Sequence, residues 1–257
     1  MAKEQASQVF GKAIERVQLE LANQILDLKE QGLTKQEILL VLESLDMEDI
    51  VLNQLGLNAD IDRLMLEYES VLASMEMTGE ITDEVLTSLV RMDKTTLIKN
   101  AGMSAEKVKS VVAQGILGNA SERDIMQSIL KGSGGVLRAD QADTLANTAL
   151  NQFERNVTME MAENDPPDAK YVYIGALDDK TRPICLEMIS AGALTRKEID
   201  LRFSGAFETA GGFNCRHRWS KETSQSSKLT NPKGAKNQIS KIKNYKKPLT
   251  PREQLNV

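Results

Sequence analysis

The sequence predicts a mainly α-helical protein in which an N-terminal helical region is followed by a small α+β module and a basic, extended C-terminal arm. Apolar residues recur at spacings of three and four along the first two thirds of the chain, which is the period of amphipathic helices. Aromatic residues make up 4% of the chain and methionines number 11, a composition typical of aliphatic helix packing rather than of a β-sandwich. After Asp165-Pro166-Pro167-Asp168 the period changes to the alternation of a strand.

Amphipathic helices are expected throughout these first two thirds. Apolar residues at helical spacing predict three helices, each ended by a glycine, over residues 8–31, 34–55 and 58–78. Thr34 and Glu37 have the spacing of a capping box at the start of the second helix. Shorter helices opened by capping residues are expected next: Thr82 to Val90, Ser104 to Leu117 and Ser121 to Lys131. The glycine-rich string over residues 132–135 predicts a flexible break before a longer helix over residues 140–161.

These elements predict three regions. Residues 1–103 form a helical N-terminal region. Residues 104–220 form one module, with helices over residues 104–164 and a small α+β segment over residues 170–220 that opens with a short strand near Tyr171. From Glu222 onward no apolar periodicity survives, so residues 221–257 are expected to form an extended tail that is ordered only by a partner.

Charge is distributed unevenly between these regions. The 257 residues carry 32 basic and 37 acidic side chains. The resulting net charge of −5 does not indicate nucleic-acid binding by the chain as a whole. Residues 221–257 hold eight lysines and one arginine against two glutamates, a net charge of +7, so the first 220 residues carry −12. An acidic body with a basic tail predicts a folded part followed by a solvated arm.

Membrane insertion and secretion are not expected. Met1 is followed by polar residues rather than by a signal peptide, and no apolar run approaches the length needed to span a bilayer. Two cysteines are too few for a secreted disulfide scaffold. We therefore expect a protein without membrane contact that is made and kept in a cytoplasm, or packaged there.

The side chains best suited to bind a metal or to act as nucleophiles are concentrated between residues 171 and 219. Both cysteines of the chain, Cys185 and Cys215, lie there with its only histidine, His217. Side chains at positions i and i+2 of an extended segment point to the same face, so Cys215 and His217 could converge with Cys185. Thiolate and imidazole ligands suit zinc, so these three residues are a candidate metal site.

Four interpretations of this cluster stay open. A zinc site would need a fourth ligand from Asp178, Asp179 or water, and the chain offers only a Cys-x-His pair where structural zinc sites usually have paired knuckles. The second interpretation is a pair of reduced, partly buried cysteines beside a buried histidine, and the third is a disulfide formed late. The fourth is a nucleophilic pair of Cys185 and His217, which no oxyanion or orienting motif accompanies.

Three arginines near the cluster could bind phosphate or carboxylate groups through bidentate contacts: Arg182, Arg216 and Arg218. We expect Arg216 instead to pair with Asp178 or Asp179 and so to join the two ends of the small module. Trp219 is expected to pack into the core of that module.

Three pieces of sequence follow one another between Ser104 and Trp219. A Gly-Ile-Leu-Gly-Asn-Ala-Ser turn over residues 115–121 precedes an Arg-Ala…Leu-Ala-Asn-Thr-Ala-Leu helix over residues 138–150. The last piece contains Tyr-x-Tyr, Asp-x-x-Thr-Arg before Cys185, a glycine soon after, and a closing Asn-Cys-Arg run. In this order the pieces resemble the Mu F-like head morphogenesis proteins of tailed bacteriophages, also called minor head or minor capsid proteins.

The closing signature departs from the family pattern, which usually reads His-x-Asn-Cys-Arg-Cys. Gly212 occupies the position of the family's histidine, and His217 occupies that of its last cysteine. Pro183 stands where the family often has a second cysteine. These departures remove candidate ligands, although a histidine at position 217 can still bind a metal. The resemblance covers a little under half of the chain and leaves residues 1–100 and the tail outside it.

The resemblance implies a structural minor head protein that acts in head morphogenesis, assembles in the host cytoplasm and resides in the virion, inside the head or at the portal vertex. Its partners would be the portal protein, the major capsid protein or both, in several copies arranged by their symmetry. The tail would contact packaged double-stranded DNA or a partner through four lysines: Lys241, Lys243, Lys246 and Lys247. The alternative for the tail is a solvated, disordered arm.

Two other functions stay open beside this one. An enzyme, of the transferase or toxin-like effector class, would have to use Cys185, Cys215 and His217, and no further catalytic motif accompanies them. A host-encoded helical adaptor could share only the small module. We expect no enzymatic activity.

Overall fold

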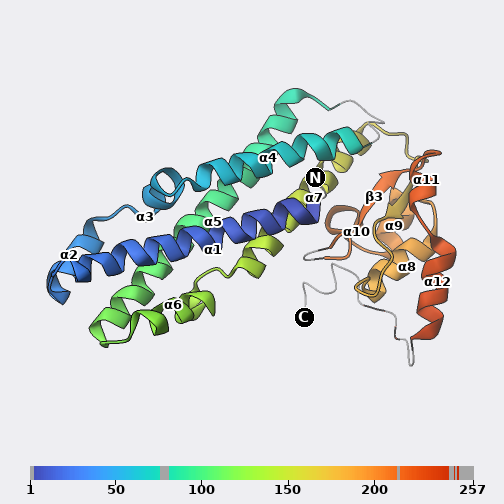
Figure 1. Ribbon diagram of the computed structural model, residues 1–257. Helices are drawn as coiled ribbons and strands as arrows, with labels where there is room; N and C mark the ends of the chain where they lie inside the picture. Colours follow the sequence, from blue (N-terminus) through green and yellow to red (C-terminus); the bar gives the residue numbers. More distant parts are fainter. Residues whose placement is uncertain (1–2, 76–80, 213–214, 243–245, 247, 249–257) are drawn as a thin grey trace. The chain divides into compact units, whose positions relative to one another are not determined.

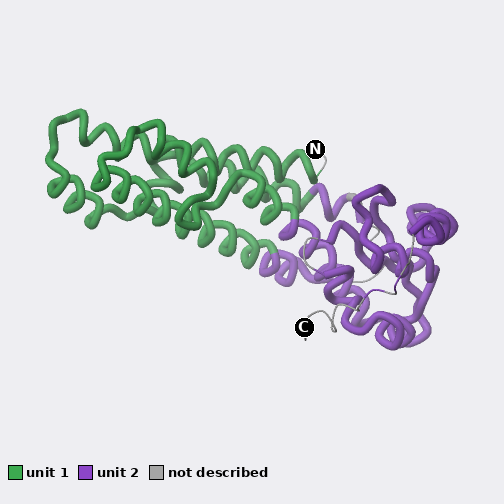
Figure 2. Tube along the Cα trace, turned by 90° about the horizontal axis from the view of Figure 1, so that it is seen from below, with its two compact units in different colours: residues 1–69, 90–147 green, residues 70–89, 148–257 purple. Residues whose placement is uncertain are grey.

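The computed structural model describes residues 3–75, 81–212, 215–242, 246 and 248 (Figure 1). The chain divides into two compact units (Figure 2). Unit 1 comprises residues 1–69 and 90–147, and unit 2 comprises residues 70–89 and 148–257. Most described residues are helical, and unit 2 adds a small antiparallel sheet, so the predicted fold class, mainly α with a small α+β part, is confirmed.

Unit 1 opens with α1 (Lys3–Glu30), whose buried apolar residues follow the expected helical period. Thr34 and Glu37 form the expected capping box at the start of α2 (Lys35–Ser44). This helix is shorter than expected because Asp46 caps a new turn, α3 (Met47–Asp49), which continues into the π-helical turn η1 (Ile50–Gln54). The next helix is α4 (Leu57–Ser74).

One long helix, α5 (Asp83–Leu117), replaces the two short helices expected over residues 82–117. It continues through position 103 because its buried apolar positions keep one face across that point, from Leu97 and Ala101 to Ala105 and Val108. The division between compact units therefore differs from the expected boundary at residue 103, since residues 90–147 belong to unit 1 and residues 70–89 belong to unit 2.

The remaining helices of unit 1 begin where capping residues predict. Ser121 accepts a hydrogen bond from the backbone of Asp124 and opens α6 (Glu122–Leu130). The glycine-rich string forms a short 3-10 turn, η2 (Ser133–Gly135), flanked and interrupted by left-handed glycines. The long helix α7 (Ala139–Glu163) follows, and its second half belongs to unit 2.

A buried polar junction joins three distant segments of unit 1. The Ser104 hydroxyl, in the middle of α5, accepts hydrogen bonds from Gln18 Nε2 at 2.7 Å and from the backbone nitrogen of Leu137 at 2.9 Å. Gln18 Nε2 also donates to the carbonyl oxygen of Leu137 at 2.9 Å. Ser104 is 4% exposed, so it is not a helix cap as expected but the acceptor that fixes α1 and the start of α7 against α5.

Unit 2 is organised around β1 (Lys170–Ile174), the central strand of a sheet with the order β2-β1-β3 in the described part of the chain. β2 (Leu194–Thr195) and β3 (Arg218–Lys221) pair with it in antiparallel fashion, and Tyr173 lies opposite Trp219. Every residue of β1 after Lys170 is buried, as expected for a strand that is covered on both faces.

Three helices complete the core of unit 2. They are α8 (Pro183–Ala191), α9 (Arg196–Arg202) and α10 (Ala206–Thr209). Trp219 is 1% exposed, and its Nε1 donates to the carbonyl oxygen of Ala206 at 3.1 Å, so the expectation that Trp219 packs into this core is confirmed.

The expected extended tail is wrong for residues 222–242. This segment contains α11 (Ser226–Leu229) and α12 (Pro232–Lys241), and α12 packs against α8. Asn231 caps α12, and the buried contact is made by Ala235, which is 0% exposed. The partly buried Ile239 packs against the same core, and two apolar residues are too few to give a strong apolar period in the sequence. Residues 243–245, 247 and 249–257 lie outside the described residues.

Ser104→Ala should destabilise unit 1 by about 1–3 kcal/mol, because the buried backbone donor of Leu137 loses its acceptor. Urea denaturation followed by circular dichroism measures the change. Ser110→Ala, at an exposed position of the same helix, is the matched control and should leave the free energy of unfolding within about 0.5 kcal/mol. Equal effects of the two substitutions would contradict a buried junction at Ser104.

Ala235→Asp should destabilise unit 2 by about 3–5 kcal/mol, because it buries an unpaired charge between α12 and α8. The control Asn237→Asp adds the same charge at an exposed position of α12. Hydrogen exchange should show faster exchange of the α8 amides in the first variant only. Unchanged α8 protection in Ala235→Asp would mean that α12 does not pack there in solution.

Candidate metal centre

The structure brings the three candidate ligands together. The Sγ atoms of Cys185 and Cys215 lie 3.6 Å apart, and Cys215 Sγ lies 3.8 Å from Nδ1 of His217. The three ligand atoms are all within 4.8 Å of one another. Each side chain is at most 4% exposed, so the cluster lies inside unit 2.

Local structure explains this convergence. Pro183 begins α8 and places Cys185 in the buried first turn of that helix. Cys215 follows a turn in which its backbone nitrogen donates to the carbonyl oxygen of Gly212, and the chain then runs through His217 into β3. Cys215 and His217 therefore both reach the core from the segment directly before β3, as their spacing predicts.

One hydrogen bond sets the tautomer of His217. Its Nε2 lies 2.8 Å from the carbonyl oxygen of Ala176, which can only accept, so Nε2 carries the proton. In the neutral ring Nδ1 then has a free lone pair, and it is this atom that lies toward Cys215. Metal-binding histidines typically have this arrangement, in which the second ring nitrogen donates to a backbone carbonyl.

Tyr173 is a fourth member of the cluster that the sequence did not reveal. Its hydroxyl oxygen lies 3.4 Å from Cys215 Sγ and 3.9 Å from Cys185 Sγ. Its ring stacks on that of His217, with ring centroids 5.5 Å apart and an interplanar angle of 7°. Burial raises the pKa of Tyr173 well above its usual range. The available signal was the Tyr-x-Tyr alternation on a strand that proves to be the central one.

Two glycines leave room for the cluster. A Cβ atom on Gly211 would lie 2.5 Å from Cys185 Sγ and 3.1 Å from Cys215 Sγ, so no other residue fits there without displacing the sulfurs. Gly175 follows β1, and a Cβ atom at this position would lie 2.4 Å from Cδ2 of the His217 ring. Both glycines thus belong to the wall of the site.

Two arginines place positive charge beside the sulfurs. Arg155 of α7 is 3% exposed, and its Nε has no hydrogen-bond partner among the described residues. Burial lowers the pKa of Arg155, and electrostatic interaction with Cys215 is the strongest influence opposing that shift. Arg182 has a buried Nη2 that also lacks a partner in the described part of the chain, next to Gly211. Nearby cations of this kind favour the thiolate form of cysteine.

The two thiols interact strongly. The hydrogen bond between them lowers the pKa of Cys215 and raises the pKa of Cys185. His217 adds to the lowering at Cys215. Loss of a proton from the pair is therefore easier at Cys215 than at Cys185.

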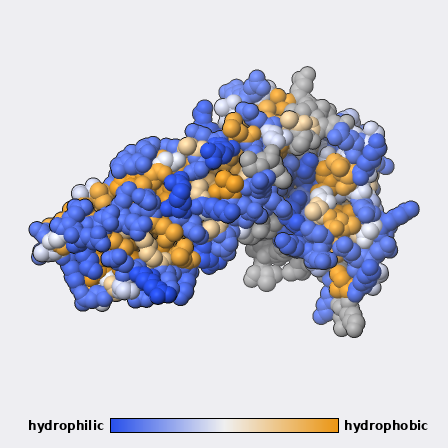
Figure 3. All heavy atoms as spheres, in the orientation of Figure 1, coloured by the Kyte–Doolittle hydropathy of each residue, from blue (hydrophilic) through white to orange (hydrophobic). Residues whose placement is uncertain are grey.

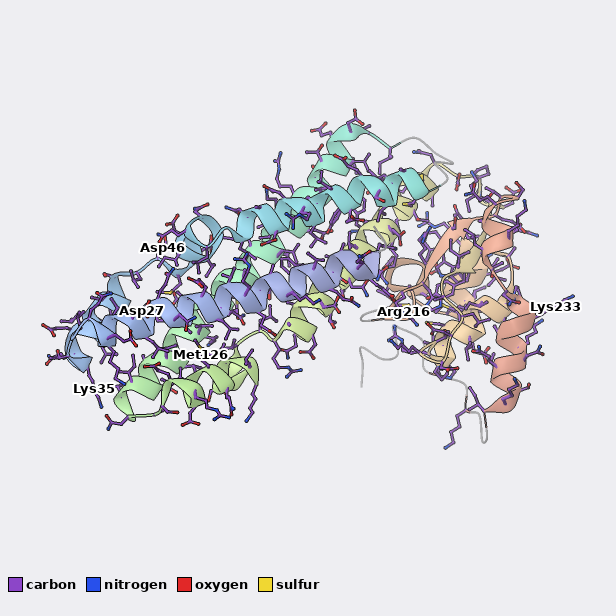
Figure 4. The ribbon with its side chains drawn as sticks, in the orientation of Figure 1. Asp27, Lys35, Asp46, Met126, Arg216 and Lys233 are labelled. Carbon is purple, nitrogen blue, oxygen red and sulfur yellow. The ribbon has the colours of Figure 1, made fainter. Side chains whose placement is uncertain are left out.

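The carboxylates proposed as a fourth ligand are not at the cluster. Asp178 accepts two hydrogen bonds from Arg216, labelled in Figure 4, at 2.7 and 2.9 Å, so this expected ion pair is confirmed and Asp178 is committed to it. Asp179 is exposed. Arg218 pairs with the buried Glu154 at 3.1 Å.

Two of the four lysines proposed for DNA or partner contact are among the described residues. Lys241 ends α12 and is exposed, and Lys246 is exposed as well. Lys243 and Lys247 lie outside the described residues.

Comparison of the chain with models of known protein families, with curated proteins and with solved structures finds no match. Among the described residues, no helix combines the length and the apolar character needed to cross a membrane. The geometry of unit 2 is thus the basis for interpreting the chain's chemistry.

Asp178→Asn should lower the stability of unit 2 by about 1 kcal/mol or less, because the ion pair with Arg216 is partly exposed. The hydrogen bonds from Arg216 hold the pKa of Asp178 well below its usual range. The pair therefore stabilises the folded state above the unfolded pKa of about 3.9, and this contribution is lost as the pH falls toward the lowered folded value.

Thermal unfolding between neutral and acidic pH checks this expectation. The difference between wild type and Asp178→Asn should be full near neutral pH and should shrink below about pH 4. Asp179→Asn, at the exposed neighbouring position, is the control and should match wild type. A difference that grows on acidification would contradict the assigned role of Asp178.

Proposed function

We propose that this chain is a structural minor head protein of a tailed bacteriophage, acting in head morphogenesis by docking on the portal or the inner capsid. The observation that supports it most is the meeting of the motif pieces. Tyr173 of the Tyr-x-Tyr strand, Cys185 after the Thr-Arg turn and Cys215 of the Asn-Cys-Arg run form one buried cluster. The parts of the last of the three pieces that carry the resemblance thus meet in a single small core, whereas residues 115–121 belong to unit 1.

Burial of this cluster favours a structural role over a catalytic one. A nucleophilic cysteine must be reached by its substrate, whereas Cys185 and Cys215 are each 1% exposed. The polar groups around them are engaged in joining segments of unit 2, as in the pairing of Arg216 with Asp178. These contacts suit a compact anchor module, and they give no support to the transferase or toxin-like alternative.

The surface of unit 1 supports docking on a protein partner. Figure 3 shows apolar residues between hydrophilic ones on this helical unit. Large apolar side chains that are more than half exposed are found on α2, α4 and α5: Leu40, Leu66, Met92, Met103 and Leu117. Where such side chains are contiguous, they would form the apolar surface that a protein partner covers.

The end of the chain supports contact with DNA or with an acidic partner. Lysines on α11, α12 and the following residues are exposed: Lys228, Lys233, Lys236, Lys241 and Lys246. Lys233 points away from the rest of unit 2 in Figure 4. Lysines on a folded helix can neutralise phosphates without sequence preference, which suits packaged double-stranded DNA.

Co-expression with the portal and major capsid proteins encoded in the same genome tests the proposal. The chain should co-purify with assembled heads in a smaller amount than the major capsid protein. Heads that form in normal number, package DNA normally and never contain the chain would contradict it.

A lysine variant tests the tail in the same heads. Replacing Lys241, Lys243, Lys246 and Lys247 with glutamine should leave incorporation unchanged and should reduce the slope of DNA affinity against salt by up to about four phosphate contacts. The control carries glutamine at four exposed lysines elsewhere: Lys12, Lys29, Lys99 and Lys107. Equal salt dependence of the two variants would mean that these four lysines do not contact DNA.

A further inference from the structure

Three donor atoms of the buried cluster lie within 4.8 Å of one another, and two of the three pairs are at the separations that a single tetrahedral zinc ion requires. Zinc–sulfur bonds of about 2.3 Å and zinc–nitrogen bonds of about 2.0 Å put two sulfurs about 3.8 Å apart and a sulfur about 3.5 Å from a nitrogen. The two Sγ atoms of Cys185 and Cys215 are 3.6 Å apart, and Cys215 Sγ is 3.8 Å from His217 Nδ1. These atoms come from α8 and from the segment before β3, so an ion would join two distant parts of unit 2.

The distances of the Tyr173 oxygen from the two sulfurs suit a fourth ligand of the same ion. A zinc–oxygen bond of about 2.1 Å puts that oxygen about 3.6 Å from each sulfur on the same ion. The observed distances are 3.4 Å to Cys215 Sγ and 3.9 Å to Cys185 Sγ. Neither Asp178 nor Asp179 is available for this position, since the first is bound by Arg216 and the second is exposed.

The surroundings of the cluster favour a cation bound by anionic ligands. His217 directs a lone pair on Nδ1 into the site, because Nε2 donates to Ala176, and the 3.8 Å to Cys215 Sγ is long for a hydrogen bond. Arg155 is 97% removed from solvent and Arg182 carries a buried Nη2, and neither Arg155 Nε nor Arg182 Nη2 has a hydrogen-bond partner in the described residues. Positive charge beside the sulfurs lowers the cost of holding two thiolates and a phenolate together around one ion.

We propose that Cys185, Cys215, His217 and Tyr173 bind one zinc ion that closes the core of unit 2. The metal holds β1, α8 and the segment before β3 at one point, and its role is structural because all four coordination positions are filled by the protein. On binding, the protons of the two thiols and of the phenol leave for solvent, and no electron is transferred. The site does not depend on what the protein assembles with.

The first test is the metal content of the full chain, purified under reducing conditions without added metal. We expect about one zinc per chain by elemental mass spectrometry. Removing the zinc with a chelator should lower the melting temperature, and adding zinc back should restore it, because metal binding and folding are coupled. Zinc-free protein with two titratable thiols, whose melting temperature responds neither to chelator nor to added zinc, would overturn the proposal. A disulfide between Cys185 and Cys215 in the native protein would overturn it as well.

The second test separates Tyr173 as a ligand from Tyr173 as a neighbour. Cobalt substitution should give the absorption of a tetrahedral ion with two thiolate ligands. Tyr173→Phe should change that spectrum and weaken zinc binding by about 10-fold or more, measured by competition with a chelating dye. Tyr171→Phe is the matched control, because Tyr171 lies on the same strand and its hydroxyl donates to Asp165 rather than to the sulfurs. Identical spectra and affinities for the two variants would exclude Tyr173 from the coordination sphere.

Discussion

Unit 2 depends on satisfying a group of polar side chains that have been removed from water. Two sulfurs, an imidazole and a phenol lie together where each is at most 4% exposed, and two arginines reach the same place. A polar group buried without a partner costs free energy, so these residues constrain one another's positions tightly. This constraint holds β1, the start of α8 and the segment before β3 in one arrangement. Gly175 and Gly211 are required there because a Cβ atom at either position would overlap the cluster.

Outside this cluster, ion pairs with different degrees of burial join segments of unit 2. Arg216 lies between Cys215 and His217 and binds Asp178, so this ion pair joins the segment before β3 to the loop between β1 and α8. Arg218 reaches Glu154 on α7, and Lys221 reaches Asp165. The partly exposed pair of Arg216 and Asp178 contributes little energy, whereas removing the partner of the buried Glu154 or Asp165 would leave an uncompensated charge. The small hydrophobic core and the buried cluster supply most of the stability.

The sequence predicted elements well where the signal is local. The capping box at Thr34 and Glu37, the cap at Ser121 and the alternation through Tyr173 each depend on neighbours a few residues away. Prediction from the sequence failed where packing between residues far apart in the chain determines the structure. Ser104 has the residue type of a helix cap. It is buried instead, and its hydroxyl accepts hydrogen bonds from Gln18 and Leu137, which are far away in the chain. The helix α12 was not predicted because only two of its apolar residues, Ala235 and the partly buried Ile239, pack against the core. At the site, the convergence of Cys185, Cys215 and His217 followed from spacing, whereas Tyr173 and Arg155 could be found only from the fold.

The position of the cluster's members along the chain has a consequence for how unit 2 is made. Tyr173, Cys185 and His217 come from separated segments, and α12, which packs on α8, comes after all of them. Contacts between residues far apart in sequence form slowly, because a long loop must close before any energy is gained. During synthesis the strand β1 therefore emerges from the ribosome without its neighbour β3 and without a cover for α8. Until residues near 241 have been translated, this half of the protein is a nascent chain with exposed apolar surface, and it is the part for which protection by a chaperone would matter most.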